Sequence, residues 1–189
     1  NGVAILSKVP FKSKDIHHRC GKEDCRHIAA NFNGFELHNI YIPAGGDIPD
    51  PDANDKFAHK LDFVDELNRW FKDRYSKDQK LIAVGDFNIA PLESDVWSHK
   101  QLLDVVSHTP VEVEALGRLQ AANDWVDLGR RFVPAPQRLY TWWSYRAQNW
   151  AESDRGRRLD HMWVTPDIAG KAVSHRVAEP ARGWTKPSD

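Results

Sequence analysis

The run Leu-Ile-Ala-Val-Gly-Asp-Phe-Asn occupies residues 81–88 and decides how the rest of the chain is interpreted. Its first four residues are apolar and suit a short buried strand, so the polar residues begin where that strand should end. We therefore expect Asp86 and Asn88 to lie side by side at the rim of a sheet. A carboxylate attracts a hard divalent cation such as Mg²⁺, and an amide can donate to a phosphate oxygen without adding negative charge. Gly, Asp and Asn are also ordinary turn residues, so the motif alone would also suit a simple turn.

Length and composition indicate a single domain over residues 1–189. The chain is 41% hydrophobic and 11% aromatic, which is enough to bury a sizeable core. No apolar run approaches the roughly 20 residues that span a bilayer, so we expect no membrane association. The formal net charge of −1 does not by itself indicate a polyanionic partner. A monomer is the expected state.

Histidine and cysteine are concentrated between residues 17 and 27. Cys20 and Cys25 are accompanied there by three histidines, and both thiolate and imidazole are zinc ligands. The spacing of four residues between the cysteines is looser than in common zinc knuckles, and the chain has no second cysteine pair. Reduced thiols in a cytosolic loop are the simplest interpretation. Structural zinc stays open as an alternative, and a disulfide is less favoured.

Hydrophobic periodicity predicts mixed helices and strands. Apolar residues at three- and four-residue spacing predict a helix from about residue 55 to 74. A second helix is expected over 110–122, where Thr-Pro-Val-Glu at 109–112 offers a capping box. Asn33-Gly34 is a favoured hairpin turn, and this mixture favours an α+β sandwich over a parallel doubly wound sheet. The expected strands cover residues 3–6, 29–32, 35–42, 81–84, 140–144 and 159–164.

Arginine is concentrated between residues 130 and 158, where seven arginines accompany only two acidic residues. Trp142, Trp143, Tyr145 and Trp150 are interleaved with them. Guanidinium groups and aromatic rings together suit contacts with phosphates and stacking on bases or sugars. A solvated charged surface would have the same composition, so this stretch gains meaning only together with the other motifs.

Four segments follow one another in a recognisable order, and the chain closes on Lys-Pro-Ser-Asp at 186–189. They are Asn-Ile-Tyr-Ile-Pro at 39–43, Gly-Asp-Phe-Asn-Ile-Ala-Pro at 85–91, Tyr-Thr-Trp-Trp-Ser-Tyr-Arg at 140–146 and Arg-Gly-Arg-Arg-Leu-Asp-His at 155–161. This set resembles the exonuclease III family of abasic-site DNA repair nucleases, within the endonuclease/exonuclease/phosphatase superfamily. The last two segments are the specific ones, and only residues 17–27 and parts of 92–125 lack a counterpart. The resemblance implies a four-layer αββα sandwich of the deoxyribonuclease-like type.

The same resemblance implies catalytic roles for four residues. Tyr41 matches the tyrosine whose hydroxyl contacts the scissile phosphate. Asp86 matches the carboxylate that orients or deprotonates the attacking water, and Asn88 matches the amide that stabilises charge developing on the phosphate. Asp160 matches a carboxylate that orients a catalytic histidine, because a carboxylate can hold an imidazole in one tautomer.

Metal and DNA contacts are implied as well. The implied cofactor is Mg²⁺, with Mn²⁺ as its substitute, and Trp142 matches an aromatic wall of the pocket that receives a base-free sugar. The implied metal ligands are Asp86, Asn88 and Asp189. The implied DNA-contacting residues are Trp142, Tyr145, Arg146, Arg155 and Arg157.

The chain also departs from the family pattern. The family places a metal-binding glutamate upstream of residue 1 and a histidine directly after Asp189, so we expect a fragment truncated at both ends and nearly inactive by itself. His161 follows Asp160 in a strand, so its side chain should point to the opposite face and cannot replace that histidine. Arg157 stands where a more apolar residue is expected.

The implied activity is hydrolysis of DNA phosphodiesters in base excision repair, 5′ to an abasic site and/or from a 3′ end. The implied partner is double-stranded DNA with abasic sites or 3′ ends, in the cytoplasm of a bacterial-type cell. Two alternatives stay open. One is a superfamily phosphodiesterase acting on a lipid head group, an inositol phosphate or a nucleotide, which the arginine-rich aromatic stretch disfavours. The other is a non-catalytic DNA-binding module.

Overall fold

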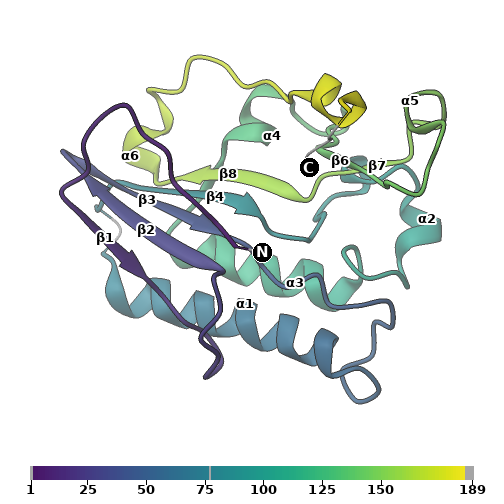
Figure 1. Ribbon diagram of the computed structural model, residues 1–189, viewed down its shortest axis with the longest axis horizontal. Coiled ribbons are helices and arrows are strands. Elements are labelled where there is room, and N and C mark those ends of the chain that lie inside the picture. Colours follow the sequence, from purple (N-terminus) through teal and green to yellow (C-terminus); the bar gives the residue numbers. More distant parts are fainter. Residues whose placement is uncertain (1, 77, 186–189) are drawn as a thin grey trace.

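The computed structural model describes residues 2–76 and 78–185. Its largest feature is a six-stranded sheet in the order β1-β2-β3-β4-β8-β5, in which only β3 and β4 are parallel neighbours (Figure 1). A second sheet pairs β6 with β7. The strands are β1 (Ser13–Ile16), β2 (His27–Phe32), β3 (Phe35–Ile40), β4 (Leu81–Asp86), β5 (Val126–Asp127), β6 (Trp142–Trp143), β7 (Gly156–Arg157) and β8 (Asp160–Val164). The helices are α1 (Asp55–Arg74), α2 (His99–Leu102), α3 (Pro110–Ala122), α4 (Leu128–Phe132), α5 (Trp150–Ser153) and α6 (Pro166–Ala169), with 3₁₀ turns at Glu93–Asp95 and Glu179–Gly183.

Local sequence signals fix the two long helices. Asn54 caps the start of α1 by accepting a hydrogen bond from the backbone N–H of Lys56 (3.1 Å). Thr109 and Glu112 form the predicted capping box of α3, with proline at the first helical position. Both helices have the bounds that the sequence predicts, because their caps and their apolar stripes agree.

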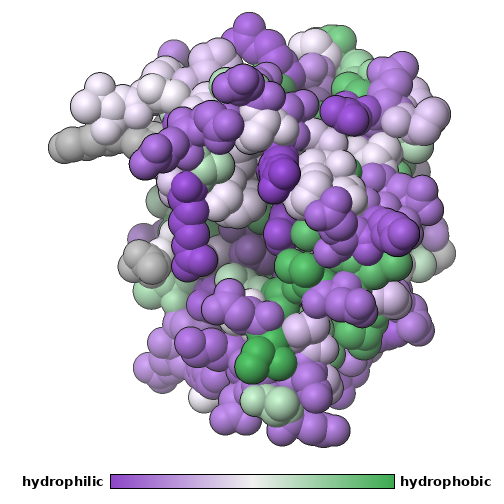
Figure 2. All heavy atoms as spheres, turned by 90° about the vertical axis from the view of Figure 1, so that its right-hand side faces the viewer, coloured by the Kyte–Doolittle hydropathy of each residue, from purple (hydrophilic) through white to green (hydrophobic). Residues whose placement is uncertain are grey.

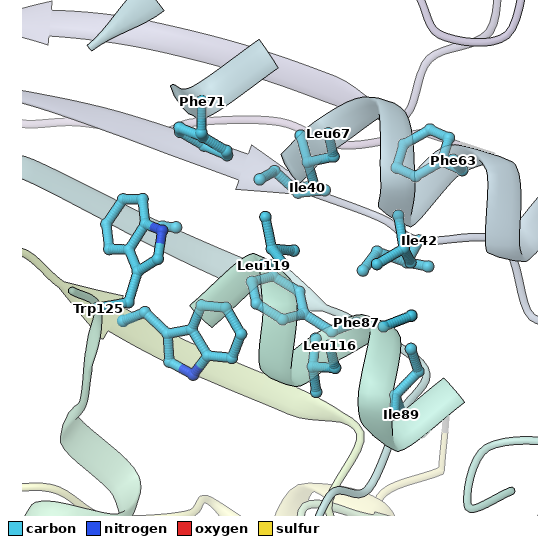
Figure 3. Close-up of a cluster of buried hydrophobic side chains, with 14 of the residues drawn as sticks. Ile40, Ile42, Phe63, Leu67, Phe71, Phe87, Ile89, Leu116, Leu119 and Trp125 are labelled. Carbon is cyan, nitrogen blue, oxygen red and sulfur yellow. The ribbon is translucent and has the colours of Figure 1, made fainter. Parts of the chain in front are cut away.

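Helices α1 and α3 lie next to each other on one face of the six-stranded sheet (Figure 1). The main hydrophobic core fills the space between them and strands β3, β4 and β8 (Figure 3). Phe87 of the Gly-Asp-Phe-Asn motif belongs to this core, and its ring meets Trp163 edge-on at 4.9 Å. Other members of the core are Ile40, Ile42, Phe63, Leu67, Phe71, Ile89, Leu116, Leu119 and Trp125.

The two faces of the sheet have different roles. Along β8, His161 and Trp163 are buried toward the helices, whereas Met162 between them is 42% exposed. Because side chains alternate along a strand, Asp160 lies on the same face as Met162. Asp86 pairs directly with Asp160 across the antiparallel β4–β8 ladder and shares its face. Both carboxylates therefore lie on the face that the long helices do not cover.

The hairpin of β2 and β3 around Asn33-Gly34 confirms the prediction, and β4 runs two residues beyond its predicted end. The prediction of a strand at residues 3–6 is wrong. That segment is not paired as a strand among the described residues, Val3 donates a single backbone bond to Cys25, and Leu6 is 92% exposed. β1 was not predicted, and the strand predicted at 140–144 shrinks to Trp142–Trp143.

The histidine- and cysteine-rich segment does not form a metal site in the described residues. Cys20 and Cys25 are free thiols. Within residues 2–76 and 78–185 no group of three or more His, Cys, Asp or Glu side chains is placed to hold a metal ion. None of the helices in this part of the chain is both long and apolar enough to cross a membrane.

Candidate active site

A cavity of about 780 Å³ lies beside the end of β4, between the loops that follow β3 and β4 and the β6–β7 hairpin. It is on the side of the molecule where α2, α5 and β6–β7 lie in Figure 1, and Figure 2 shows this face hollowed near its centre, with hydrophilic residues above and to the left of the hollow and hydrophobic residues to its lower right. Asp160 lines a smaller adjoining cavity of about 260 Å³, which shares Trp142 and Trp143 with the larger one. The predicted site residues that line the larger cavity are Tyr41, Asp86, Asn88, Trp142, Tyr145, Arg146, Arg155 and Arg157.

The end of β4 is shaped by its glycine. Gly85 has φ +132°, and a Cβ atom there would lie 2.1 Å from the carbonyl oxygen of Ile40. Only glycine permits this approach of β4 to β3. The next residue, Asp86, then accepts a hydrogen bond from the backbone N–H of Asn88 (2.8 Å), which closes a tight turn at the strand end.

Asn88 is held in an unusual conformation. Its φ is +53°, in the left-handed region that asparagine tolerates better than most residues. Its side-chain amide donates to the carbonyl oxygen of Ile42 (2.9 Å), and the residue is 9% exposed. This hydrogen bond fixes the orientation of the amide at the wall of the cavity.

Asp160 lies opposite Asp86 at the start of β8. The hydroxyl oxygen of Thr141 accepts hydrogen bonds from the backbone N–H groups of Leu159 and Asp160, both at 3.0 Å. These bonds tie the start of β8 to the segment that leads into β6. Two carboxylates on directly opposed residues concentrate negative charge at the sheet rim, which favours a cation there.

Tyr41 reaches the cavity from the segment after β3. Its backbone N–H donates to the carbonyl oxygen of Arg26 (2.7 Å), and the Arg26 guanidinium lies 4.8 Å from the centre of its ring. Asp24 binds Arg26 at 2.9 Å. The segment at 17–27, to which the sequence assigned no role, therefore supports the aromatic ring of the predicted catalytic tyrosine.

The opposite wall consists of paired arginines and tryptophans. Arg155 lies 4.7 Å over the ring of Trp97, and Arg157 lies 5.8 Å over the ring of Trp142. The backbone N–H of Trp97 donates to Gly156 (3.1 Å), so this tryptophan is attached to the β6–β7 sheet. Trp97 was not predicted as a site residue, because it falls in the stretch of 92–125 that lacks the family motifs.

The predicted DNA contacts differ in their surroundings. Tyr145, Arg146 and Arg155 are exposed, whereas Arg157 is half-buried. The Arg157 guanidinium donates to the carbonyl oxygen of Val106 (3.1 Å) and to the hydroxyl of Ser107 (2.8 Å). Arg157 thus connects the wall to the loop before α3 while lining the cavity, and burial lowers its pKa.

Two arginines of the same stretch are used inside the protein. Arg158 is 2% exposed and donates to Asp95 (2.7 and 3.0 Å) and to Asp127 (2.6 Å), while Arg130 also binds Asp95. Burial opposes ionisation of Asp127, but the adjacent Arg158 guanidinium brings the pKa of that carboxyl below its ordinary value. These ion pairs anchor the segment between β7 and β8.

His161 faces away from Asp160, as predicted. It is 5% exposed, donates from Nε2 to the carbonyl oxygen of Ile89 (2.8 Å) and stacks on Phe87. Burial, helped by the nearby Arg158 charge, lowers the pKa of His161 to about 4. The ring is therefore neutral at pH 7 and part of the core.

The cavity offers oxygen donors to a metal ion. The Asp86 carboxylate and the Asn88 amide oxygen are ligands of the kind that Mg²⁺ prefers, and Mg²⁺ usually keeps several water ligands. The chemistry of these donors fits that ion. Asp189, the third predicted ligand, lies outside the described residues.

The fold and the site define the class of protein. A mixed sheet with a carboxylate and an amide at its rim, facing an arginine- and tryptophan-lined wall, suits a hydrolase that handles phosphate esters. Residues 1–189 match the Endonuclease/Exonuclease/phosphatase family, and the chain belongs to that family. Nucleases of this family are typically metal-dependent.

Known proteins resemble the chain over nearly its whole length. Exodeoxyribonuclease III from Haemophilus influenzae is 26% identical over 204 residues, covering 100% of this chain and 73% of that protein. The structure of an AP endonuclease from Archaeoglobus fulgidus has a TM-score of 0.82 at 26% identity, covering 96% of this chain and 66% of that one. The 3′ phosphatase NExo from Neisseria, bound to product DNA hairpin, has a TM-score of 0.83 at 26% identity, covering 97% and 69%. These comparisons confirm the predicted endonuclease/exonuclease/phosphatase fold.

Proposed function

We propose that the protein is a DNA repair nuclease that hydrolyses phosphodiesters of double-stranded DNA, 5′ to abasic sites and/or from 3′ ends, with Mg²⁺ or in its place Mn²⁺. One observation carries the proposal. Asp86, Asn88 and Tyr41 line the same cavity as Trp142 and the arginines of the facing wall. Groups suited to phosphate chemistry and groups suited to DNA contacts therefore meet at one place.

The residues of the cavity divide the work of hydrolysis. Asp86 orients a water molecule and takes up its proton as the water oxygen bonds to phosphorus, while the P–O3′ bond breaks and the departing 3′ oxygen takes a proton from solvent. The Asn88 amide and the Tyr41 hydroxyl donate to phosphate oxygens as negative charge builds up on them. A divalent ion at Asp86 and Asn88, with Asp189, would add positive charge beside the phosphate. Phosphate transfer depends mostly on positioning and charge stabilisation, so several modest polar groups suffice.

Selectivity for an abasic site follows from stacking. An abasic nucleotide has lost its base, so turning it out of the duplex costs less than turning out an intact nucleotide. Trp142 and Arg157 border the cavity at half-buried positions, where a ring and a guanidinium can pack on a bare sugar. The exposed Arg146 and Arg155 are placed to contact flanking phosphates.

We also propose that the protein acts in the cytoplasm and as a monomer. A nuclease that maintains the DNA of a bacterial cell acts in the cytoplasm, and the proposed catalytic residues all come from a single copy of the chain, so no second copy is needed for catalysis. Light scattering of the purified protein should give the mass of a monomer. A stable dimer would contradict this part of the proposal.

Three substrates test the activity side by side with the full-length protein. They are a duplex with one abasic site, a duplex with a recessed 3′ end, and a small aryl phosphodiester, each with Mg²⁺ and with a chelator. We expect metal-dependent cleavage of at least one duplex and little turnover of the small ester. Turnover of the small ester alone would favour a phosphodiesterase with another substrate. Tight duplex binding without turnover would favour a DNA-binding module.

A further inference from the structure

A buried ion pair lies beneath the loops that line the active-site cavity. Lys60 of α1 and Glu112 of α3 are both 0% exposed, and the Lys60 ammonium contacts the Glu112 carboxylate. Each belongs to one of the two long helices that cover the other face of the sheet. The pair thus connects the helical layer to the cavity.

The Lys60 ammonium holds two loops that carry site residues. It donates to the carbonyl oxygen of Asn88 (2.8 Å) and to that of Ala44 (3.2 Å), three residues after Tyr41. Asn88, whose backbone is in the left-handed region, is thus held by the ammonium through its carbonyl oxygen. Gly45 leaves room for this contact, since a Cβ atom there would lie 2.9 Å from the Lys60 side chain.

Glu112 holds the third loop. Its carboxylate accepts hydrogen bonds from the backbone N–H of Ser107 (3.0 and 2.9 Å) and from the N–H and hydroxyl of Thr109 (3.2 and 2.6 Å). Ser107 in turn accepts a bond from the N–H of Ala90 (2.7 Å), which joins this loop to the one after β4. Segments 41–46, 88–90 and 105–109 therefore converge on a single ion pair.

A fully buried ion pair contributes little net free energy to the stability of a fold. Removing two charges from water costs several kcal/mol per ion, and well-packed apolar residues are often as good for stability. Burial lowers the pKa of Lys60, although Glu112 and Asp86 oppose that shift by favouring the charged ammonium. What apolar residues cannot supply is a donor that reaches two carbonyl groups on separate loops at once.

We propose that Lys60 and Glu112 are positioning residues of the active site, which set the position of the Asn88 backbone, and through it the placement of the Asn88 amide, and the path of the loop after Tyr41. The effect of this positioning on catalysis rests on the proposed nuclease function. Neither residue contacts the substrate in this arrangement, and both act through the loops.

Substitutions at both residues test the proposal in the full-length protein. Lys60→Met removes the ammonium with little change in length, and the combined Lys60→Met/Glu112→Gln variant leaves no unpaired buried charge. Arg118→Met is the matched control, because Arg118 joins the same two helices through an exposed contact with Asp65 (3.1 Å). Its effect on cleavage should be less than about twofold, since exposed pairs contribute little.

The kinetic result separates positioning from general damage. The combined variant should lower kcat about 30- to 100-fold with KM within about threefold, because small displacements of positioned groups cost up to about 10² in rate. In an Asn88→Ala background the same substitutions should lower kcat by a clearly smaller factor than in the wild type, since one of the two groups that they position is already absent. An unchanged kcat, or equal losses in both backgrounds, would overturn the proposal.

A spectroscopic measurement separates this inference from the nuclease proposal. The side-chain amide resonances of Asn88 should shift in the combined variant and stay unchanged in Arg118→Met. If the wild-type protein cleaves no DNA, the nuclease proposal fails, and these resonances decide the positioning inference alone. If the combined variant does not fold, Lys60→Arg replaces it. That variant keeps the charge but not the three-way contact, and unshifted Asn88 resonances in it would contradict the inference.

Discussion

The two ends of the six-stranded sheet bury polar groups in opposite ways. At the cavity end several buried groups form ion pairs, as Arg158 does with Asp95 and Asp127 and as Lys60 does with Glu112. At the other end, beneath β2 and β3, two neutral imidazoles are buried, those of His27 and His38, both 0% exposed, and Arg19 (4% exposed) lies beside them. The first network is built from ion pairs, and the second depends on histidines that stay neutral.

The hydrogen bonds at the histidine end define the tautomers. Arg19 lies 3.0 Å from His27 Nδ1 and can only donate, so that nitrogen must be unprotonated. His27 Nε2 then carries the hydrogen and donates to His38 Nδ1 (3.0 Å). His38 Nε2 lies 3.5 Å from the carboxylate of Glu36, which also accepts from Tyr75 (2.6 Å). The chain of bonds holds only while both imidazoles are neutral.

This difference suggests a division of labour between the ends. The ion pairs at the cavity hold its loops in place through short directional contacts. The neutral histidines fill the space between β2, β3 and α1, where ring contacts with Trp70 and Phe71 predominate. We expect the cavity end to be sensitive to loss of a partner and the histidine end to be sensitive to acid.

The largest effect should come from Arg158→Met. It removes the bidentate partner of the Asp95 carboxylate, which is 0% exposed, and leaves Arg130 as the cation beside it; breaking a buried pair costs about 3–5 kcal/mol. Urea unfolding would measure this loss of stability. Arg138→Met is the control, because Arg138 is 70% exposed and lies 3.8 Å from Asp154, and it should cost less than about 1 kcal/mol. A similar cost for both variants would remove the contrast between the two ends.

Asp86→Asn should have the next largest effect, on catalysis instead of stability. The substitution removes the carboxylate that would accept the proton from water, so cleavage of abasic duplex should fall at least about 10²-fold. DNA binding should be unchanged or slightly tighter, because one negative charge near the phosphate is removed. Single-turnover cleavage and fluorescence anisotropy would measure the two quantities. Retention of more than about a tenth of the wild-type rate would exclude Asp86 from the mechanism.

Acid should weaken the protein mainly through the buried histidines. Burial lowers the pKa of His38 to about 3 and that of His27 well below 6.5. The folded state therefore holds fewer protons than the unfolded chain, so stability is complete above about pH 6.5 and falls with pH below it. Each such histidine contributes a slope of up to about 1.4 kcal/mol per pH unit.

The variant His38→Gln sharpens this measurement. Because His161 at the cavity end also has a lowered pKa, about 4, the informative quantity is the difference between variant and wild type. Unfolding free energy measured between pH 6.5 and 4.5 should fall less steeply in His38→Gln, by close to one proton. Equal slopes would mean that His38 does not stay neutral in the folded protein.

The fold could be predicted where the signal was local. Capping residues and periodic apolar residues predict α1 and α3, and Asn33-Gly34 predicts the β2–β3 hairpin. The apolar segment at 3–6 misled the prediction, because an apolar run predicts a strand only if a partner strand lies beside it, and pairing is not local.

The site could be predicted only in part for the same reason. Asp86 and Asn88 follow from a motif at a strand end, and Tyr41 and Trp142 from the family resemblance. The sequence could not show which of seven arginines turn inward, because Arg158 meets Asp95 across 63 residues of chain. The burial of Lys60 and Glu112 could not be predicted either, since a lysine and a glutamate on helices are normally solvent-exposed.

The smallest effect should come from a substitution in the β6–β7 wall of the cavity, at Trp142. Trp142 is half-buried, stacks with Arg157 and lines the cavity, so Trp142→Ala should weaken binding to abasic duplex by about 1–3 kcal/mol. Intact duplex should lose less, because its stacked nucleotides do not enter the cavity. Trp184→Ala is the control, since Trp184 is 65% exposed and does not line the cavity. Anisotropy titrations with both duplexes would measure the difference. Equal losses on both duplexes would argue that Trp142 packs the β6–β7 sheet instead of receiving the lesion.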